Sequence, residues 1–263
     1  MTTYDISNYS LVLCGLLLLI PAIISYMTKL RIMRKSMTTV GRMAIQLFLV
    51  GLFLTFLFDL NNSYVNMAWV LVMVLVAAYT SIDNINLKVK ELYFPMVCSF
   101  LGGNILILLY FNHFVVSLDH LFDARYLIPI AGMFLGNSLR GNVVGVSDFF
   151  NSIKHNEVSY INRLSFGAKK HEALMPYIRN SLLVSLRPTL ASMVTIGIVT
   201  LPGMMTGLLL GGASPILAIK YQMAIMIGIY VSTMLTVSLS LFVSIYGGFD
   251  NYGLIKKQIF QNS

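Results

Sequence analysis

The chain has 263 residues, of which 57% are hydrophobic and 11% are charged, and its mean hydropathy is +0.79. This composition excludes an ordinary soluble domain and indicates an integral membrane protein. Unbroken apolar runs exclude a membrane β-barrel, whose strands would alternate with a period of two, and the distribution of the +8 net charge argues against nucleic acid as a partner.

About seven segments are apolar over enough residues to cross a hydrocarbon core of about 30 Å, which takes about 20 helical residues. They cover residues 9–27, 43–58, 65–80, 93–111, 126–147, 188–212 and 221–246. The sequence therefore predicts an all-α fold, a polytopic membrane helical bundle of about seven transmembrane helices that forms a single domain over residues 1–263.

Basic residues mark alternate loops between these segments. They are Lys29, Arg31, Arg34, Lys35, Arg42, Lys88, Lys90, Lys154, Arg163, Lys169, Lys170, Arg179, Lys256 and Lys257. The other connecting loops carry only Arg125 and Lys220. The positive-inside rule then predicts an N-terminus outside and a C-terminus in the cytoplasm. We expect the protein in the inner (plasma) membrane of the cell, with anionic lipid beside the basic loops. No positive charge precedes the first apolar run, so we expect a retained helix there and not a signal peptide.

Signatures of catalysis and of energy coupling are missing from the sequence. By these boundaries all ten carboxylates lie in loops or at helix ends, whereas transporters coupled to protons or sodium usually carry an ionisable group inside the bilayer. An HExxH pattern starts at His171, but Met175 replaces its second zinc ligand. No G-x-x-x-x-G-K-S/T loop occurs. We expect no catalytic residues and no cofactor bound by this chain, so active transport would draw its energy from another subunit.

The segment 126–147 carries glycines at a spacing typical of helices that pack closely in lipid. Two small-xxx-small pairs occur there, Gly132 with Gly136 and Gly141 with Gly145. At about 100° per residue, Gly132 and Gly141 lie about 180° apart around the helix. We therefore expect the two pairs to face different neighbours, which makes this helix central in the bundle.

Two polar side chains of the same segment leave alternatives open. Asn137 either makes a hydrogen bond between helices or lines a polar path. Arg140 is the one charge inside a predicted span. Its side chain either extends to the cytoplasmic surface or faces an internal cavity.

The segment 188–212 contains a helix-breaking pair, Pro202 and Gly203, which predicts a kink or a break. Broken helices expose backbone carbonyls that can bind ions where they line a cavity. Met204 and Met205 follow directly, and their thioethers either bind a soft ion or fill gaps in the packing. Farther along, Ser214 is expected to cap a helix that starts at Pro215.

The cytoplasmic loop of residues 148–180 mixes apolar and basic residues, which predicts a folded segment. Gly167 is expected to separate a short helix that ends near Phe166 from a second helix that runs toward residue 188. A short helix that presents Leu164 and Phe166 suits docking into a groove of a partner; the alternative is a helix on the membrane surface. In the outer loop of residues 112–125, Asp119, His120 and Asp123 form either a weak metal-binding group or solvated charges.

Four sequence stretches resemble one family. They are IPIAGMFLGN at residues 128–137, LSFGAKK at 164–170, TLPGMMTGLLLGGASP at 200–215 and AIKYQ at 218–222. Together they are similar to the FetB-type ABC transporter permeases, which include bacterial iron exporters and plant proteins linked to aluminium tolerance.

The resemblance implies a permease domain, two copies of which pair with two cytosolic ATPase subunits that hold ATP-Mg. The loop around Gly167 resembles the coupling helix of bacterial ABC permeases, and its carried-over residues are Leu164, Ser165, Phe166, Gly167 and Ala168. The Glu-Ala-Ala of importer permeases is replaced by Ile161, Asn162 and Arg163, which argues against that importer type.

The sequence thus leads to the hypothesis of a homodimeric permease that exports a metal ion, with iron as the expected metal and a separate subunit as its ATPase. Expected path residues are Asn137, Pro202, Gly203, Met204 and Met205. The alternatives are a passive metal or small-solute channel, and an ABC permease for a non-metal substrate.

Overall fold

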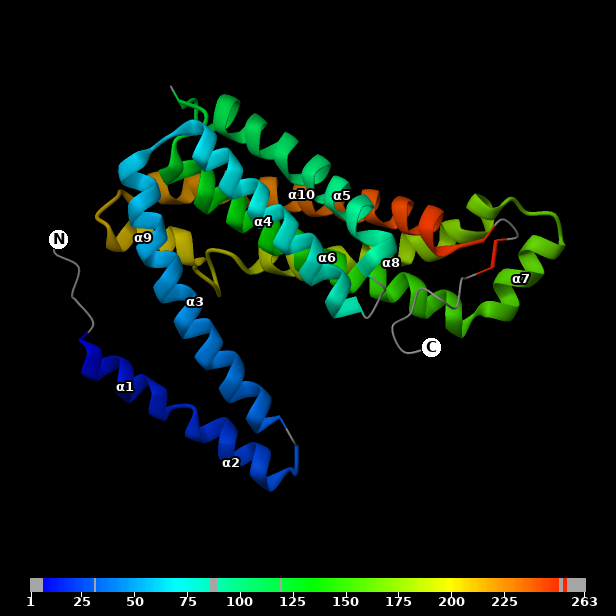
Figure 1. Ribbon diagram of the computed structural model, residues 1–263, viewed down its shortest axis with the longest axis horizontal. Helices are drawn as coiled ribbons and strands as arrows, with labels where there is room; N and C mark the ends of the chain where they lie inside the picture. The colour runs from blue at the N-terminus through cyan, green and yellow to red at the C-terminus, as the bar shows by residue number, and fades with distance from the viewer. Residues whose placement is uncertain (1–6, 31, 86–88, 119, 251–252, 255–263) are drawn as a thin grey trace. The chain divides into compact units, whose positions relative to one another are not determined.

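The computed structural model describes residues 7–30, 32–85, 89–118, 120–250 and 253–254. Over this part of the chain the secondary structure is helical, with one isolated bridge between Ile196 and Thr200 and no β-strand (Figure 1). The all-α prediction is therefore confirmed. Backbone contacts group the chain into two compact units, one of residues 1–60 with 210–212 and one of residues 61–209 with 213–263.

The first unit consists of α1 (Asn8–Leu16), α2 (Leu19–Met27) and α3 (Met33–Leu60). The hydroxyl of Ser7 caps α1 by accepting a hydrogen bond from the Ser10 backbone N–H at 3.2 Å. α3 begins ten residues before the predicted span of residues 43–58, which lies inside this helix. Nothing from Met33 to Leu60 breaks a helix, and a helix can extend past the hydrocarbon core when its terminal residues are basic.

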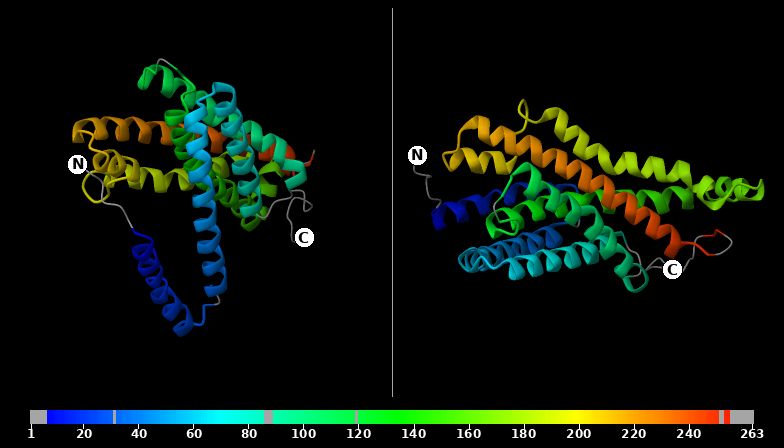
Figure 2. Two further views of the ribbon diagram at one scale, coloured as in Figure 1. Left: turned by 60° about the vertical axis from the view of Figure 1, so that its left-hand side comes forward. Right: turned by 90° about the horizontal axis from the view of Figure 1, so that it is seen from above.

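The second unit contains the remaining helices, except for Leu210 at the end of α9. They are α4 (Ser63–Ile85), α5 (Val89–Tyr110) with the π-helical turn η1 (Phe111–Val115), α6 (Ala124–His155), α7 (Glu157–Ser165), α8 (Lys170–Thr195), α9 (Gly203–Leu210) and α10 (Pro215–Gly248). α4, α5, α6, α8 and α10 lie side by side (Figures 1 and 2). α6 packs against α4, α5, α8 and α10, and α10 packs against α5, α6 and α8. α6 and α10 therefore form the centre of this unit.

Buried polar side chains join these helices. Asn104 of α5 donates from Nδ2 to Thr236 Oγ1 of α10 at 3.0 Å and accepts through Oδ1 from Ser138 Oγ of α6 at 3.0 Å. Asn142 of α6 donates to Ser81 Oγ of α4 at 2.8 Å. Hydrogen bonds of this kind hold helices together in lipid, where hydrophobic burial does not drive their association.

Five helical segments of the described residues are long and apolar enough to cross a membrane: Tyr9–Met27, Met33–Leu60, Ser63–Ile85, Leu92–Val115 and Pro215–Gly248. The chain is therefore a multi-pass membrane protein. The predicted span 126–147 lies inside α6, whose hydropathy is lowered by residues such as Asn137, Arg140 and Asn142 that face the protein and its cavity. The count of seven crossings and their orientation stay predictions.

The predicted span 188–212 is interrupted, and its first residues continue the helix that was predicted after Gly167. α8 begins at Lys170 and continues through Pro176 and Pro188 to Thr195, and α9 starts at Gly203. The interruption covers residues 196–202 and therefore ends at the Pro202–Gly203 pair. α9 lies beyond the end of α8, and the chain then reverses into α10 (Figures 1 and 2). As predicted, Ser214 caps α10 and Pro215 is its first residue.

Candidate functional site

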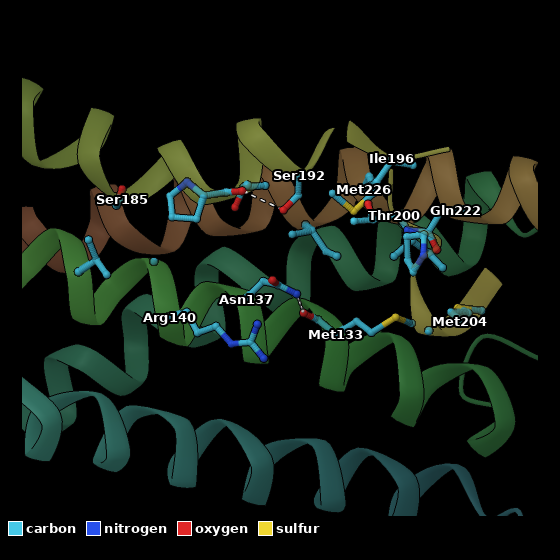
Figure 3. A pocket seen from close by; sticks show the side chains of 18 residues that line it. Met133, Asn137, Arg140, Ser185, Ser192, Ile196, Thr200, Met204, Gln222 and Met226 are labelled. Carbon is cyan, nitrogen blue, oxygen red and sulfur yellow. Dashed lines mark hydrogen bonds between the residues drawn. The ribbon is translucent and has the colours of Figure 1, made fainter. Parts of the chain in front are cut away.

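A cavity of about 680 Å³ lies next to the helix interruption. Its wall is made by the middle of α6, the last turns of α8, the segment 196–202, the start of α9 and the first half of α10 (Figure 3). All these elements belong to the second unit. The cavity therefore lies where a broken helix meets the two central helices.

Four of the five predicted path residues line this cavity, namely Asn137, Pro202, Gly203 and Met204. Asn137 donates from Nδ2 to the Met133 carbonyl, one turn earlier in α6, at 2.8 Å. Met205 does not line the cavity and is buried with 8% of its surface exposed. Adjacent residues of a helix point about 100° apart, so the two methionines face different surroundings and Met205 is a packing residue.

The interruption between α8 and α9 has a defined backbone. Gly197 takes a positive φ of 86°, a conformation that costs a glycine little. Its N–H donates to the Thr200 carbonyl at 2.9 Å, and the Val199 N–H donates to the Thr195 carbonyl at 2.9 Å. α9 then starts with the Thr206 N–H donating to the Pro202 carbonyl at 3.0 Å. The irregular segment between α8 and α9 thus forms part of the cavity wall, as is usual for broken helices at binding sites.

Three lining residues were missed by the sequence reasoning. Met133 of α6 and Met226 of α10 add thioethers to that of Met204 (Figure 3). Gln222 of α10 is 4% exposed, and no described group bonds its Oε1 atom. The sequence did contain one signal for Gln222, which is an amide in a mostly apolar helical segment. Polar residues in such positions usually face protein or water.

Arg140 lines the cavity from α6, which agrees with the second of its two readings. Its side chain is exposed and lies beside Asn137 in Figure 3. Arg187, which the predicted boundary at residue 188 left in a loop, lies inside α8 and does not line the cavity. The two arginines therefore differ in surroundings although both lie within long helices.

The glycines of α6 meet different neighbours. A Cβ atom on Gly141 would lie 2.5 Å from Thr233 Cγ2 of α10, and one on Gly145 would lie 2.8 Å from Val237 Cγ1. A Cβ atom on Gly132 would lie 3.4 Å from Met73 of α4, and one on Gly136 would meet nothing within 4 Å. Gly141 and Gly145 therefore let α10 approach α6, while Gly132 faces α4.

At the far end of the second unit from the α8–α9 interruption, α7 and the turn after it form the element that resembles a coupling helix. Gly167 has a positive φ of 89°, and the Ala168 N–H closes the turn on the Arg163 carbonyl at 3.1 Å, a common helix C-terminus. The predicted break at Gly167 is therefore confirmed.

The side chains of this element differ in exposure. Ser165 donates to the Ile161 carbonyl at 3.1 Å. Leu164 is only partly exposed and packs against the core, whereas Phe166 is 91% exposed. Phe166, and not Leu164, is thus the side chain that projects.

An aromatic cluster connects α7 to the end of α10. The Tyr160 hydroxyl donates to the Gly253 carbonyl at 2.7 Å, and its ring centroid lies 6.1 Å from that of Phe249. The Lys170 Nζ atom lies 5.0 Å from the Phe249 ring centroid, within range of a cation–π attraction. We call Tyr160, Lys170, Phe249 and Gly253 the α7 latch.

The α7 latch predicts a dependence of stability on high pH. Burial, with smaller effects from the Asp250 charge and Tyr177, raises the pKa of Tyr160 from 10.0 to about 12. Above pH 10 the unfolded chain loses this proton while the folded chain retains it, so folding stability falls from about pH 10 to pH 12. Tyr160→Phe removes this dependence and costs about 1 kcal/mol at neutral pH through the lost hydrogen bond. Urea unfolding of both proteins across this range measures it; a difference between the two that does not change with pH would contradict the assignment.

Among the described residues, no group of three or more His, Cys, Asp or Glu side chains is placed to hold a metal ion. Of the outer-loop residues considered for this role, Asp119 lies outside the described residues. The structure therefore leaves that metal-binding group a prediction.

Comparison with known proteins matches the chain, over residues 8–249, to the model of a family described as "Uncharacterised protein family (UPF0014)". It is 32% identical to the Escherichia coli K12 protein named "Probable iron export permease protein FetB", over 94% of this chain and 92% of the relative. It is 33% identical to the Arabidopsis thaliana "Protein ALUMINUM SENSITIVE 3", over 79% and 75%. It is 30% identical to the Bacillus subtilis 168 "UPF0014 membrane protein YjkA", over 86% and 89%. No solved structure matches the chain.

Proposed function

Because the chain belongs to the UPF0014 family of membrane proteins, we propose that it is the permease subunit of an ABC transporter that exports a metal ion. The name of the Escherichia coli relative, a probable iron export permease, supports export and makes iron the proposed metal. This chain has no nucleotide-binding loop of its own, so a separate cytosolic subunit supplies ATP hydrolysis. Two copies of the permease pair with two such ATPases in the inner (plasma) membrane.

The observation that carries the proposal is the cavity beside a broken helix. Transporters commonly place their binding sites near the middle of the membrane, where discontinuous helices expose backbone groups. Here residues 196–202 interrupt the helical run. Three of them, Ile196, Thr200 and Pro202, line the cavity together with Asn137 and Met204. We assign the cavity to the translocation path.

In the proposed topology of seven crossings, with the N-terminus outside, α7 lies in the cytoplasm. Leu164, Ser165, Phe166, Gly167 and Ala168 then form the coupling element, in which Phe166 enters a groove of the ATPase. The α7 latch carries movement of α7 to the end of α10, and the first half of α10 lines the cavity. This route connects ATP hydrolysis to the path without a nucleotide site in the permease.

Filling the cavity is expected to block transport. Gly203 and Gly207 both belong to α9, and a Cβ atom on either meets nothing within 4 Å, but only Gly203 lines the cavity. Gly203→Phe should therefore reduce ATP-dependent metal export to background, and Gly207→Phe should leave it nearly unchanged. Uptake of radioactive iron into inverted membrane vesicles measures both. Equal transport by the two variants would remove the cavity from the path.

The partner subunit is tested separately. Purification of the tagged permease from membranes of its native host is expected to recover an ATP-binding protein, and vesicle transport should stop without ATP. Transport down a gradient without ATP would instead support the passive channel, which is the alternative function for the same cavity.

A further inference from the structure

The cavity carries one formal charge, and that charge is positive. Among the 18 described residues that line it, Arg140 is the only ionisable one, and the others are apolar residues, glycines, hydroxyl residues, amides and methionines. No hydrogen bond or ion pair joins Arg140 to another described residue. Arg140 follows the first residue of α6 by 16 positions, about 24 Å along the helix. A charge this far from the helix end normally has a partner.

A second polar group of the cavity also has no partner. Gln222 is 4% exposed, and no described group bonds its Oε1 atom. The residue belongs to α10 and lines the cavity opposite the α6 residues Asn137 and Arg140 (Figure 3). A buried amide oxygen without a partner is costly, so the site is built to receive a hydrogen-bond donor from the cargo or from water.

This set of groups does not suit a bare metal cation. Hard cations select carboxylate and carbonyl oxygens, and the lining provides no carboxylate. The thioethers of Met133, Met204 and Met226 suit soft ions, but they are neutral and cannot offset the repulsion from Arg140. A guanidinium, in contrast, matches the geometry of carboxylate and phosphate groups, to which it donates two parallel hydrogen bonds.

We propose that the cavity binds its cargo as a species that carries carboxylate or phosphate oxygens, which pair with Arg140, while an N–H or O–H of the cargo donates to Gln222. A metal ion would then cross as its complex with such an oxyanion and not as a bare cation. This inference rests on the proposed function, because it assigns the cargo of the same cavity.

Binding to the purified permease in lipid nanodiscs tests the inference with four probes: citrate, inorganic phosphate, ferric citrate and ferrous chloride. Titration calorimetry is expected to show binding of at least one of the three oxyanion probes. Comparison of the affinities for citrate and phosphate identifies the preferred oxyanion. Comparison of the affinities for ferric citrate and citrate shows whether the metal strengthens binding. Arg140→Gln should weaken this binding about 10- to 100-fold, as expected for loss of a charged hydrogen-bond pair, and Arg140→Lys should restore part of it.

Arg125→Gln is the matched control, because Arg125 is exposed, belongs to the same helix and does not line the cavity. It should bind the probes as the unmodified protein does. Absence of oxyanion binding, or binding that Arg140→Gln leaves unchanged, overturns the inference, as does ferrous chloride binding to the unmodified protein that is tighter than binding of all three oxyanion probes. ATP-dependent vesicle transport is measured beside these titrations. ATP-dependent transport of the bare cation would support the proposed function but contradict the inference about the cargo. Oxyanion binding without ATP-dependent transport would support the assignment of the binding groups but contradict the proposed function.

Discussion

Gly103→Ala is expected to destabilise the permease more than a substitution at any of the α6 glycines. A Cβ atom at this position would lie 2.7 Å from the Thr236 backbone nitrogen and 2.8 Å from its Cα atom. Side chains can change rotamer to relieve such contacts, but the backbone of α10 cannot. α5 and α10 must therefore separate, which also strains the neighbouring hydrogen bond between Asn104 and Thr236. Overpacking of this kind costs about 1–3 kcal/mol or more.

The matched control for this prediction is Gly136→Ala on α6, since a Cβ atom there meets nothing within 4 Å. Alanine favours a helix over glycine by up to about 1 kcal/mol, so this variant should be as stable as the unmodified protein or slightly more stable. Thermal unfolding in detergent, followed by loss of the monodisperse peak in gel filtration, measures both variants. Equal melting temperatures for Gly103→Ala and Gly136→Ala would show that α5 and α10 do not approach this closely.

If the proposed function is right, Phe166→Ala uncouples the permease from the proposed ATPase subunit and leaves the fold of the permease intact. Phe166 is 91% exposed, so its removal takes little from the packing of the permease itself. Burial of a phenylalanine side chain in a partner groove contributes about 2–3 kcal/mol, which corresponds to a loss of about 30- to 150-fold in association. Recovery of the ATPase with the tagged permease, and stimulation of its ATP hydrolysis, should both fall.

Phe114→Ala provides the control for this second prediction. Phe114 is 65% exposed and belongs to η1, at the opposite end of the second unit from α7 (Figure 1). Its loss removes a similar apolar area without touching the proposed docking element. If both variants recover the ATPase as well as the unmodified permease, Phe166 is not the docking residue, and the membrane-surface reading of α7 gains support.

The α7 latch and the cavity describe one route for movement through the second unit. α7 contacts the end of α10 through Tyr160 and Phe249, and α10 reaches the cavity through Gln222 and Met226. α10 has 34 residues in one helix, about 51 Å at 1.5 Å per residue. A displacement at the end of α10 that contacts α7 can therefore tilt the wall of the cavity. Under the proposed function, α10 thus connects the proposed docking element to the residues that line the cavity.

Local signals in the sequence were sufficient for several elements. Apolar composition and length predict the helical segments, Ser214 and Pro215 predict where α10 begins, and Gly167 predicts where α7 ends. Each of these depends on the conformational preference of a residue and its near neighbours. The start of α3 at Met33 had no such signal, because hydropathy changes little there and the predicted span began only at residue 43.

The candidate site was predictable in part for the same reason. A proline followed directly by a glycine disfavours a continuous helix, so the interruption that ends at Pro202 and Gly203 could be predicted from the sequence. Met204 and Met205 are indistinguishable by residue type, and only the rotation of α9 against its neighbours separates a lining residue from a packing residue. Met133, Met226 and Gln222 carry no local signal that assigns them to one cavity.

What the sequence by itself determined is thus the helical membrane class, the broken helix and the exposed turn after α7, since these follow from short-range preferences. Only the tertiary structure decided which side chains share the cavity. It also decided that Arg140 lines the cavity and that no carboxylate is among the lining residues. The physical reason is that the cavity combines residues of α6 with residues of α10 that follow about 80 to 90 positions later in the chain. The rotation of α6 relative to α10 depends on close contacts such as Gly141 with Thr233 and Gly145 with Val237, which no single helix encodes.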